Sequence, residues 1–349
     1  MVKRIVEVLA VSLVAWGGAA RADTALFDER GGIAVTLEAP LGRIAADDGD
    51  EPVYQNATLI WKDASGAEVR MPLKVEPRGK SRRADTACKF PPLRLNFPKD
   101  TPSGTPFSGL DKVKLVTHCG RIGETGAAYA TRVELELLLY RVFNRVSATS
   151  LRVQPLEVTY VDTEKGGKHS THAAFLIEPE EWLAKRRELR LAKVDSIERE
   201  QLEPVQANLA EVFQFLVGNT DFSMIRGPKG DDCCHNIVLL AAPNGAMLPV
   251  PYDFDATGVV AAPYARPVEG LGIRNVQQRL YRGYCRPEPT LQSTLERFRE
   301  ARADIYALFK SDPRLDAATI ERTTNYLDEF YEIIDQPENL KRKVSSRCL

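Results

Sequence analysis

Apolar and polar residues alternate along residues 32–119, in short runs that glycine, proline and aspartate interrupt. Alternation with a period of two is typical of β-strands that bury one face. Turn-forming residues between two of the runs predict a hairpin at Asp63–Glu68. The predicted strand segments read GIAVTLEAPL, ATLIWKD, VRMPLKVEP, FPPLRLNF and DKVKLVTHC.

Helical spacing replaces this alternation at residues 128–145, where apolar residues such as Leu137 and Phe143 fall on one face. Two more strand segments follow, LRVQPLEVTYVD and HAAFLIEP. From Pro179 onward, amphipathic helical patterns dominate the chain. Their main predicted ranges are 203–218, 290–309 and 316–334.

The chain is therefore expected to divide near Glu178 into two parts of an α+β protein. A strand-rich part with one long helix covers residues 23–178, and a mainly helical part covers residues 179–349. A short predicted hairpin interrupts the helical part. A chain of 349 residues is long enough for two such units and a large core.

The first 22 residues have the order of a secretory signal peptide. Lys3 and Arg4 precede an apolar run, and Ala20-Arg21-Ala22 offers small residues for cleavage after Ala22. The apolar run is too short to span a membrane, although an N-terminal anchor or a buried helix is the alternative interpretation. We expect a periplasmic or secreted mature protein with no integral membrane segment.

The charge of the chain is nearly balanced. Its 47 basic and 48 acidic residues give a formal net charge of −1. No overall field therefore favours nucleic acid or acidic lipid as a partner.

Cysteines are the second compositional signal, and six follow the predicted signal peptide. An even number in an oxidising compartment favours disulfides. Cys88 and Cys119 each lie at one end of a predicted strand, so we expect that pair. Cys233 and Cys234 would close a strained ring with each other, so we expect at least one of them to reach one of the two remaining cysteines, Cys285 and Cys348. A zinc site in which Cys233, Cys234 and His235 are ligands is the competing interpretation, although contiguous ligands are poorly spaced.

The predicted hairpin in the helical part carries candidate chemistry. Apolar strands at 237–240 and 247–250 flank Asn244-Gly245, a strong hairpin signal. Because an antiparallel hairpin places its outer ends side by side, Asn236 and Asp253 should meet at one edge. Carboxylate and amide oxygens are ligands that Mg²⁺ takes. Helix and turn capping is the structural alternative for such residues.

An aspartate precedes the hairpin in a loop. Asp221 follows the predicted helix that ends at Gly218, and the order is then loop Asp, loop Asn, hairpin and a second Asp. Phosphotransferases of the protein-kinase type use this order, with the first Asp at the acceptor hydroxyl and the later residues on the metal ions. The order therefore favours phosphoryl transfer.

Several motifs in sequence order resemble the CotH-type (spore coat protein H-like) atypical kinases, especially an exported bacterial branch. They run from about residue 70 to residue 260. The matching segments are VEPRGKSRRADTACKFPPLRLNF, GLDKVKLVTHC, ELLLYRVFN, HAAFLIE, GNTDFS, CHNIVLL and PYDFD. The resemblance implies a two-lobed, protein-kinase-like fold and transfer of the ATP γ-phosphoryl group to protein Ser/Thr hydroxyls, with Mg²⁺ as the metal.

The resemblance also implies roles for individual residues. Asp221 would be the catalytic base, and the metal ligands would be Asn236, Asp253 and, as a possible third, Asp255. Lys89 would contact the phosphates and pair with Glu136 on the long helix, for which Glu134 is the competing choice. Further positive charge would come from Arg78, Arg82 and Arg94.

Some features depart from the protein-kinase pattern. Fourteen residues separate Asp221 from Asn236, where that pattern has four, and no clear Gly-rich loop is present. Export also puts the ATP donor in question. Two other functions therefore stay open: a catalytically inactive kinase-fold protein that serves as an envelope binding or assembly module, and a metal-dependent hydrolase.

Overall fold

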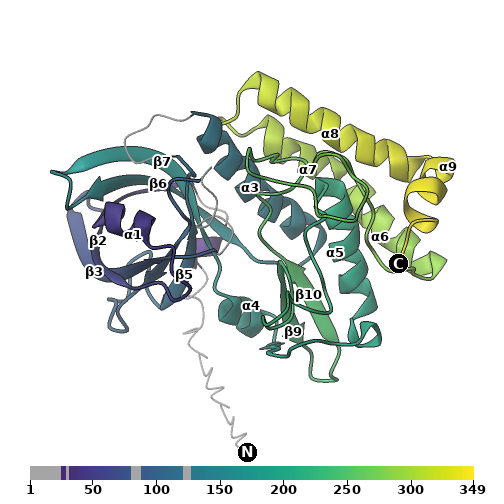
Figure 1. Cartoon of the computed structure of the whole chain (residues 1–349), viewed down its shortest axis with the longest axis horizontal. Coiled ribbons are helices and arrows are strands. Elements are labelled where there is room, and N and C mark those ends of the chain that lie inside the picture. Colours follow the sequence, from purple (N-terminus) through teal and green to yellow (C-terminus); the bar gives the residue numbers. More distant parts are fainter. Residues whose placement is uncertain (1–24, 29–30, 80–87, 121–126) are drawn as a thin grey trace, which may run out of the picture.

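Seven strands form a closed β-barrel in the first half of the protein (Figure 1). The computed structural model describes residues 25–28, 31–79, 88–120 and 127–349. The barrel strands are β1 (Ile33–Ala39), β2 (Gln55–Lys62), β3 (Glu68–Pro77), β4 (Leu93–Asn96), β5 (Lys112–Val116), β6 (Val153–Asp162) and β7 (Lys168–Ile177). Around the barrel they follow the order β1-β2-β3-β4-β5-β7-β6.

The barrel closes through its only parallel pairing among these strands. β1 pairs with β6 from Ile33↔Leu156 to Ala39↔Asp162, and every other neighbouring pair is antiparallel. Along β1 the buried residues alternate with partly exposed ones, so one face of each strand fills the barrel interior. Closure leaves no edge strand to shield from other chains.

This barrel corrects the expected two-lobed, kinase-like fold, which is wrong. The alternation in the sequence reveals that strands exist, but it does not reveal which strands pair. The decisive pairing joins residues 33–39 to residues 156–162, across strands β2 to β5 and the helices that lie among them in the chain. The alternation of apolar and polar residues within one strand carries no information about a partner more than a hundred residues away in the sequence.

Helices build the second half of the protein, to one side of the barrel in Figure 1. The α-helices after the barrel are α4 (Glu180–Arg186), α5 (Pro204–Val217), α6 (Glu288–Glu300), α7 (Arg302–Lys310), α8 (Ala317–Asp335) and α9 (Pro337–Leu340). A short helix, α1 (Leu41–Ala46), covers the barrel, and short 3₁₀ or π turns occupy Ala25–Phe27, Arg199–Gln201 and Lys341–Ser345. A small sheet of β8 (Arg190–Leu191), β9 (Ile237–Ala241) and β10 (Met247–Pro251) has the order β10-β9-β8.

Helix α3 (Ala127–Val146) connects the two halves. It follows β5 in the chain, packs on β6 and β7, and also contacts α5 and α7. Its buried apolar residues belong to the large core of the helical half, whereas the barrel interior forms a separate core. The halves therefore share a helix that the chain order assigns to the first half. Whether residues 23–178 and 179–349 are separate units stays a prediction.

Most of the predicted elements agree with the structure. The helices expected at 128–145, 203–218 and 316–334 correspond to α3, α5 and α8. The helix expected at 290–309 is instead two helices, because the chain turns at Ala301 between α6 and α7.

Three disulfides join the six cysteines. Cys88–Cys119 forms as expected. The expectation for Cys233 and Cys234 was wrong, since these neighbours are bonded to each other. Cys285 instead pairs with Cys348, where the backbone of Leu349 exchanges hydrogen bonds with Gly283 and Cys285.

The three disulfides are compatible with a protein that folds outside the reducing cytoplasm. The predicted signal peptide, residues 1–22, lies outside the described residues. Among the residues that are described, no helix combines the length and apolar character needed to cross a membrane.

Candidate active site

The hairpin of β9 and β10 brings Asn236 and Asp253 to one end of the small sheet. Ile237 pairs with Pro251, and the next backbone bond runs from the Tyr252 N–H to the Asn236 carbonyl at 3.1 Å. Both residues have left-handed backbone, with φ of 52° at Asn236 and 64° at Asp253. Asn and Asp adopt this conformation more readily than other non-glycine residues. Strained backbone of this kind clusters at functional sites.

Asp221 reaches the same place from the end of α5. The helix ends at Gly218, whose φ of 70° reverses the chain. The Asn236 side chain then donates from Nδ2 to the Asp221 carbonyl at 2.8 Å and to Oδ2 at 3.2 Å. Paired backbone bonds between Ser223 and His235 close the intervening loop. The long insertion therefore forms a closed loop, and Asp221 and Asn236 are neighbours in space although fourteen residues separate them in the sequence.

His235 is a member of this cluster that sequence reasoning missed as a partner of Asp221. Its Nε2 donates to Asp221 Oδ1 at 2.7 Å. That hydrogen bond raises the pKa of His235 above its ordinary value, although burial opposes it. The Asp221 side chain keeps 42% of its surface exposed, so a substrate can reach its carboxylate. The only signal in the sequence is the position of His235 directly before Asn236.

Arg282 holds the Asp221 peptide from both sides. Its guanidinium donates to the carbonyls of Thr220 and Phe222. Burial lowers the pKa of Arg282, and the charge of Asp221 acts in the opposite direction. Arg282 comes from the segment before α6, and no motif pointed to it.

The two aspartates after β10 have hydroxyl partners. The Asp253 N–H donates to the Tyr140 hydroxyl of α3 at 3.0 Å, and the Tyr264 hydroxyl donates to Asp255 Oδ2 at 2.9 Å. Burial raises the pKa of Tyr140 well above its usual range, and the charges of Glu136 and Asp253 act in the same direction. Tyr140 therefore remains a neutral phenol that fixes the turn carrying Asp253.

A cleft of about 210 Å³ contains these groups. From the helical half, the lining residues include Asp221, His235, Asn236, Asp253, Asp255, Tyr264 and Arg266. Arg78 comes from the barrel side, just after β3, where its backbone N–H donates to Pro92 at 2.8 Å. The cleft is thus lined by three carboxylate residues and two arginines.

The remaining predicted residues lie at different places. Glu136 is 2% exposed on α3, does not line the cleft, and acts on Tyr140 through its charge. Lys89 is exposed and does not line the cleft; its backbone N–H donates to the Cys119 carbonyl. Arg94 donates to Glu76 at 2.9 Å on the barrel. Arg82 lies outside the described residues.

The donor set fits a cation that shares its coordination with a ligand. In the described part of the chain, no group of three or more His, Cys, Asp and Glu side chains can hold a metal ion by itself. The two Asn236 side-chain bonds use Nδ2 and not Oδ1, and Asp253 and Asp255 line the same cleft as Asn236. Mg²⁺ is usually held by one or two carboxylates together with phosphate oxygens and water.

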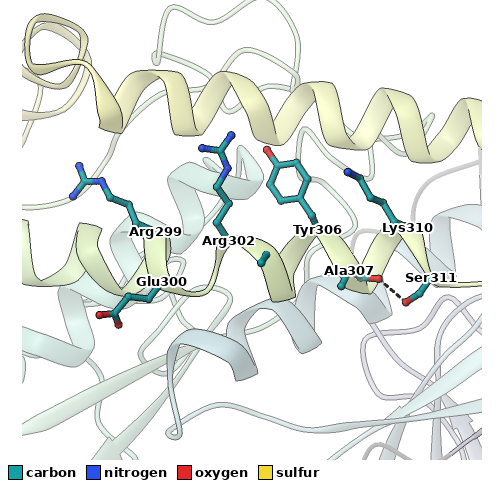
Figure 2. A pocket seen from close by; sticks show the side chains of 8 residues that line it. Arg299, Glu300, Arg302, Tyr306, Ala307, Lys310 and Ser311 are labelled. Carbon is teal, nitrogen blue, oxygen red and sulfur yellow. Dashed lines mark hydrogen bonds between the residues drawn. The ribbon is translucent and has the colours of Figure 1, made fainter.

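A second hollow, on α7, has a different character (Figure 2). Arg302, Tyr306 and Lys310 point from their helix toward α8 in this view. Arg302 lies 3.5 Å from Asp335, and the Tyr306 hydroxyl donates to Asp328. These charges hold two helices together, so this hollow is a helix contact and not a candidate active site.

Comparison with protein-family models and with curated proteins gives no match for this chain. The resemblance to CotH-type kinases therefore stays a prediction from the motifs.

Proposed function

We propose that the protein is a phosphotransferase that moves the γ-phosphoryl group of Mg²⁺-bound ATP to a hydroxyl, with Ser and Thr side chains of proteins as acceptors. One observation carries the proposal. The amide nitrogen of Asn236 donates to Asp221, its amide oxygen takes no part in these two bonds, and Asn236 and Asp253 line the same cleft. A single residue thus links a proton acceptor to a cation site. The proposal depends on this cleft and not on the fold.

Asp221 is the proton acceptor in this proposal. Its carboxylate is accessible, and His235 and Asn236 fix its orientation. As the substrate hydroxyl oxygen bonds to the γ-phosphorus, the bond to the β–γ bridging oxygen breaks. ADP leaves with the electron pair, and Asp221 takes the hydroxyl proton.

Asn236 and Asp253 would hold the metal, with Asp255 beside them. When bound, Mg²⁺ neutralises the charge that develops on the phosphate oxygens. Arg78 and Arg266 add positive charge to the cleft and attract an anionic donor. Three disulfides support a periplasmic or extracellular location for the reaction.

Unfolding and transfer measurements on the oxidised protein test the proposal. Mg²⁺ with ATP should raise the thermal midpoint, because a ligand that binds only the folded state stabilises it. Asp253→Ala should remove that rise. Asp221→Asn should keep the rise but slow labelled phosphoryl transfer to dephosphorylated casein about 10²–10⁴-fold.

Asp100→Asn is the matched control, since Asp100 is an exposed carboxylate between β4 and β5. It should behave as the wild type in both measurements. An unchanged midpoint of the wild type with Mg²⁺ and ATP, or full transfer by Asp221→Asn, would contradict the proposal.

A second candidate is a binding or assembly module of the cell envelope without catalysis. The volume of the cleft, about 210 Å³, favours it, because sites that enclose a whole small molecule usually measure about 300–1,000 Å³. A folded wild type whose midpoint is unchanged by Mg²⁺ and ATP, with no transfer to any hydroxyl acceptor, would support this function instead.

A further inference from the structure

A larger cavity lies on another face of α3. Its volume is about 870 Å³, and it is enclosed by α3, the barrel strands β1, β6 and β7, and the turn between α7 and α8. It shares no lining residue with the cleft of Asp221. The size suits a small organic molecule.

Glu134 is the distinctive group of this cavity. It lines the space from α3, yet its residue surface is only 7% exposed. Among the described residues, its Oε2 has no hydrogen-bond partner. A buried carboxylate oxygen without a partner is costly, because water is lost and nothing replaces it. Burial accordingly raises the pKa of Glu134 to about 7.

Arg314, whose charge also acts on Glu134, has a carboxylate partner of its own. Arg314 donates to both carboxylate oxygens of Asp312, in the turn before α8. Arg141, one further α3 residue of the lining, acts through its charge on the same Asp312. Glu157 of β6 is exposed at the rim. Glu134 is therefore a buried acid of this cavity that still has a carboxylate oxygen, Oε2, available to accept a hydrogen bond.

The histidine in the wall adds no competing positive charge. His172 of β7 lines the cavity and stacks on His118, with ring centroids 3.5 Å apart. Burial lowers the pKa of both, to about 3 for His118. Near neutral pH this wall is uncharged, so an incoming cation meets no repulsion from it.

Apolar residues form much of the remaining wall. Leu156, Ala173, Leu308 and Pro313 line the space around the acid. We propose that this cavity binds a small organic cation, an ammonium group attached to an apolar body, whose N–H groups donate to the Glu134 carboxylate while the body contacts the apolar wall. This inference is independent of the function proposed for the Asp221 cleft.

A binding titration with 2-phenylethylammonium tests the inference. Glu134→Gln keeps the shape of the side chain and removes its charge, and it should weaken binding about tenfold or more, the size expected for a charge-assisted hydrogen bond. Glu134→Asp should retain part of the affinity. Glu332→Gln, at an exposed carboxylate of α8 that does not line the cavity, is the matched control and should bind as the wild type does.

Two neutral or anionic analogues separate charge from shape. The uncharged 2-phenylethanol should bind at least about tenfold more weakly than the ammonium. Binding of 3-phenylpropionate in preference to the ammonium would overturn the inference and assign the cavity to anions that contact Arg141 and Arg314. Equal ammonium affinity in the wild type and a folded Glu134→Gln, or no ammonium binding to the wild type, would also overturn it.

The pH dependence gives a second readout. Ammonium binding requires ionised Glu134, so affinity should rise between pH 6 and pH 8 and level off above that. The other charged or titratable groups that line the cavity are Arg141, Asp312, Arg314, Glu157 and His172. Burial lowers the pKa of His172, which moves its titration away from this interval. An affinity independent of pH would contradict the role of Glu134.

Discussion

Helix α3 borders two hollows that use polar groups in opposite ways. On one face, the Tyr140 hydroxyl accepts a hydrogen bond from the Asp253 N–H and so supports the cleft of Asp221. On another face, Glu134 enters a cavity about four times larger with one carboxylate oxygen unpartnered. Hydrogen bonds within the protein orient the acids of the first hollow, where the unpartnered group among the described lining residues is a cation, Nε of Arg78, whereas in the second hollow an acid is left unpartnered. A site preorganised for chemistry and a site prepared for a ligand differ in this respect.

Removal of the Tyr140 hydroxyl tests the first hollow and should have the largest effect. Tyr140→Phe deprives the Asp253 N–H of its partner, and we expect a loss of about 1–3 kcal/mol in the free energy of unfolding. Phosphoryl transfer should also fall, because Asp253 loses its support. Chemical denaturation and transfer rates measure the two effects.

Tyr160→Phe is the matched control for that experiment. Tyr160 is as deeply buried as Tyr140, but its hydroxyl has no hydrogen-bond partner within the described residues. Its removal should leave stability unchanged or slightly higher. Equal destabilisation by both substitutions would mean that the Tyr140–Asp253 bond contributes nothing specific.

Neutralisation of Glu134 tests the second hollow. The folded-state pKa of about 7 lies above the ordinary value of 4.5, so the folded protein loses stability as pH rises from about 4.5 through 7. Glu134→Gln lacks this loss and should exceed the wild type by about 1–2 kcal/mol at pH 8, with little difference at pH 4.5. Unfolding free energies measured across this pH range check it. A pH-independent difference would show that the carboxylate is not penalised by burial.

The stacked histidines give the smallest effect, with the opposite dependence on pH. The pKa of His118 falls from 6.5 to about 3 on folding, so the stability of the wild type is complete above pH 6.5 and decreases as pH falls below it. His118→Phe cannot be protonated and should gain about 1 kcal/mol relative to the wild type at pH 5.5. The comparison at pH 7.5 is the reference, and a relative loss at acid pH would contradict the assignment.

The sequence predicted the parts of the cleft that local signals determine. Asn244-Gly245 fixes the hairpin turn and hence the meeting of Asn236 with Asp253. Gly218 ends α5 and delivers Asp221. In each case a few adjacent residues with known backbone preferences determine the geometry, so no distant contact has to be guessed.

Long-range contacts were beyond prediction. Barrel closure depends on the pairing of β1 with β6, which no local pattern encodes, and the kinase-like fold was wrong for that reason. The cavity of Glu134 exists only because the closed barrel and the turn before α8 approach the same helix. On the sequence, Glu134 and Glu136 were competing candidates for one role, whereas the structure separates them.

The order of elements along the chain has a consequence for synthesis. Helix α3 is buried on nearly all sides, with Val133, Leu135, Leu138, Val142 and Phe143 each at most 5% exposed. Much of its cover comes from α5 and α7, which emerge only after the barrel strands are complete. A nascent chain that ends near Glu178 can cover α3 only on the side that packs on β6 and β7, and the apolar side that later meets α5 and α7 is exposed, a surface prone to association. The barrel can form early, but the core around α3 is complete only after the last third of the chain has been synthesised.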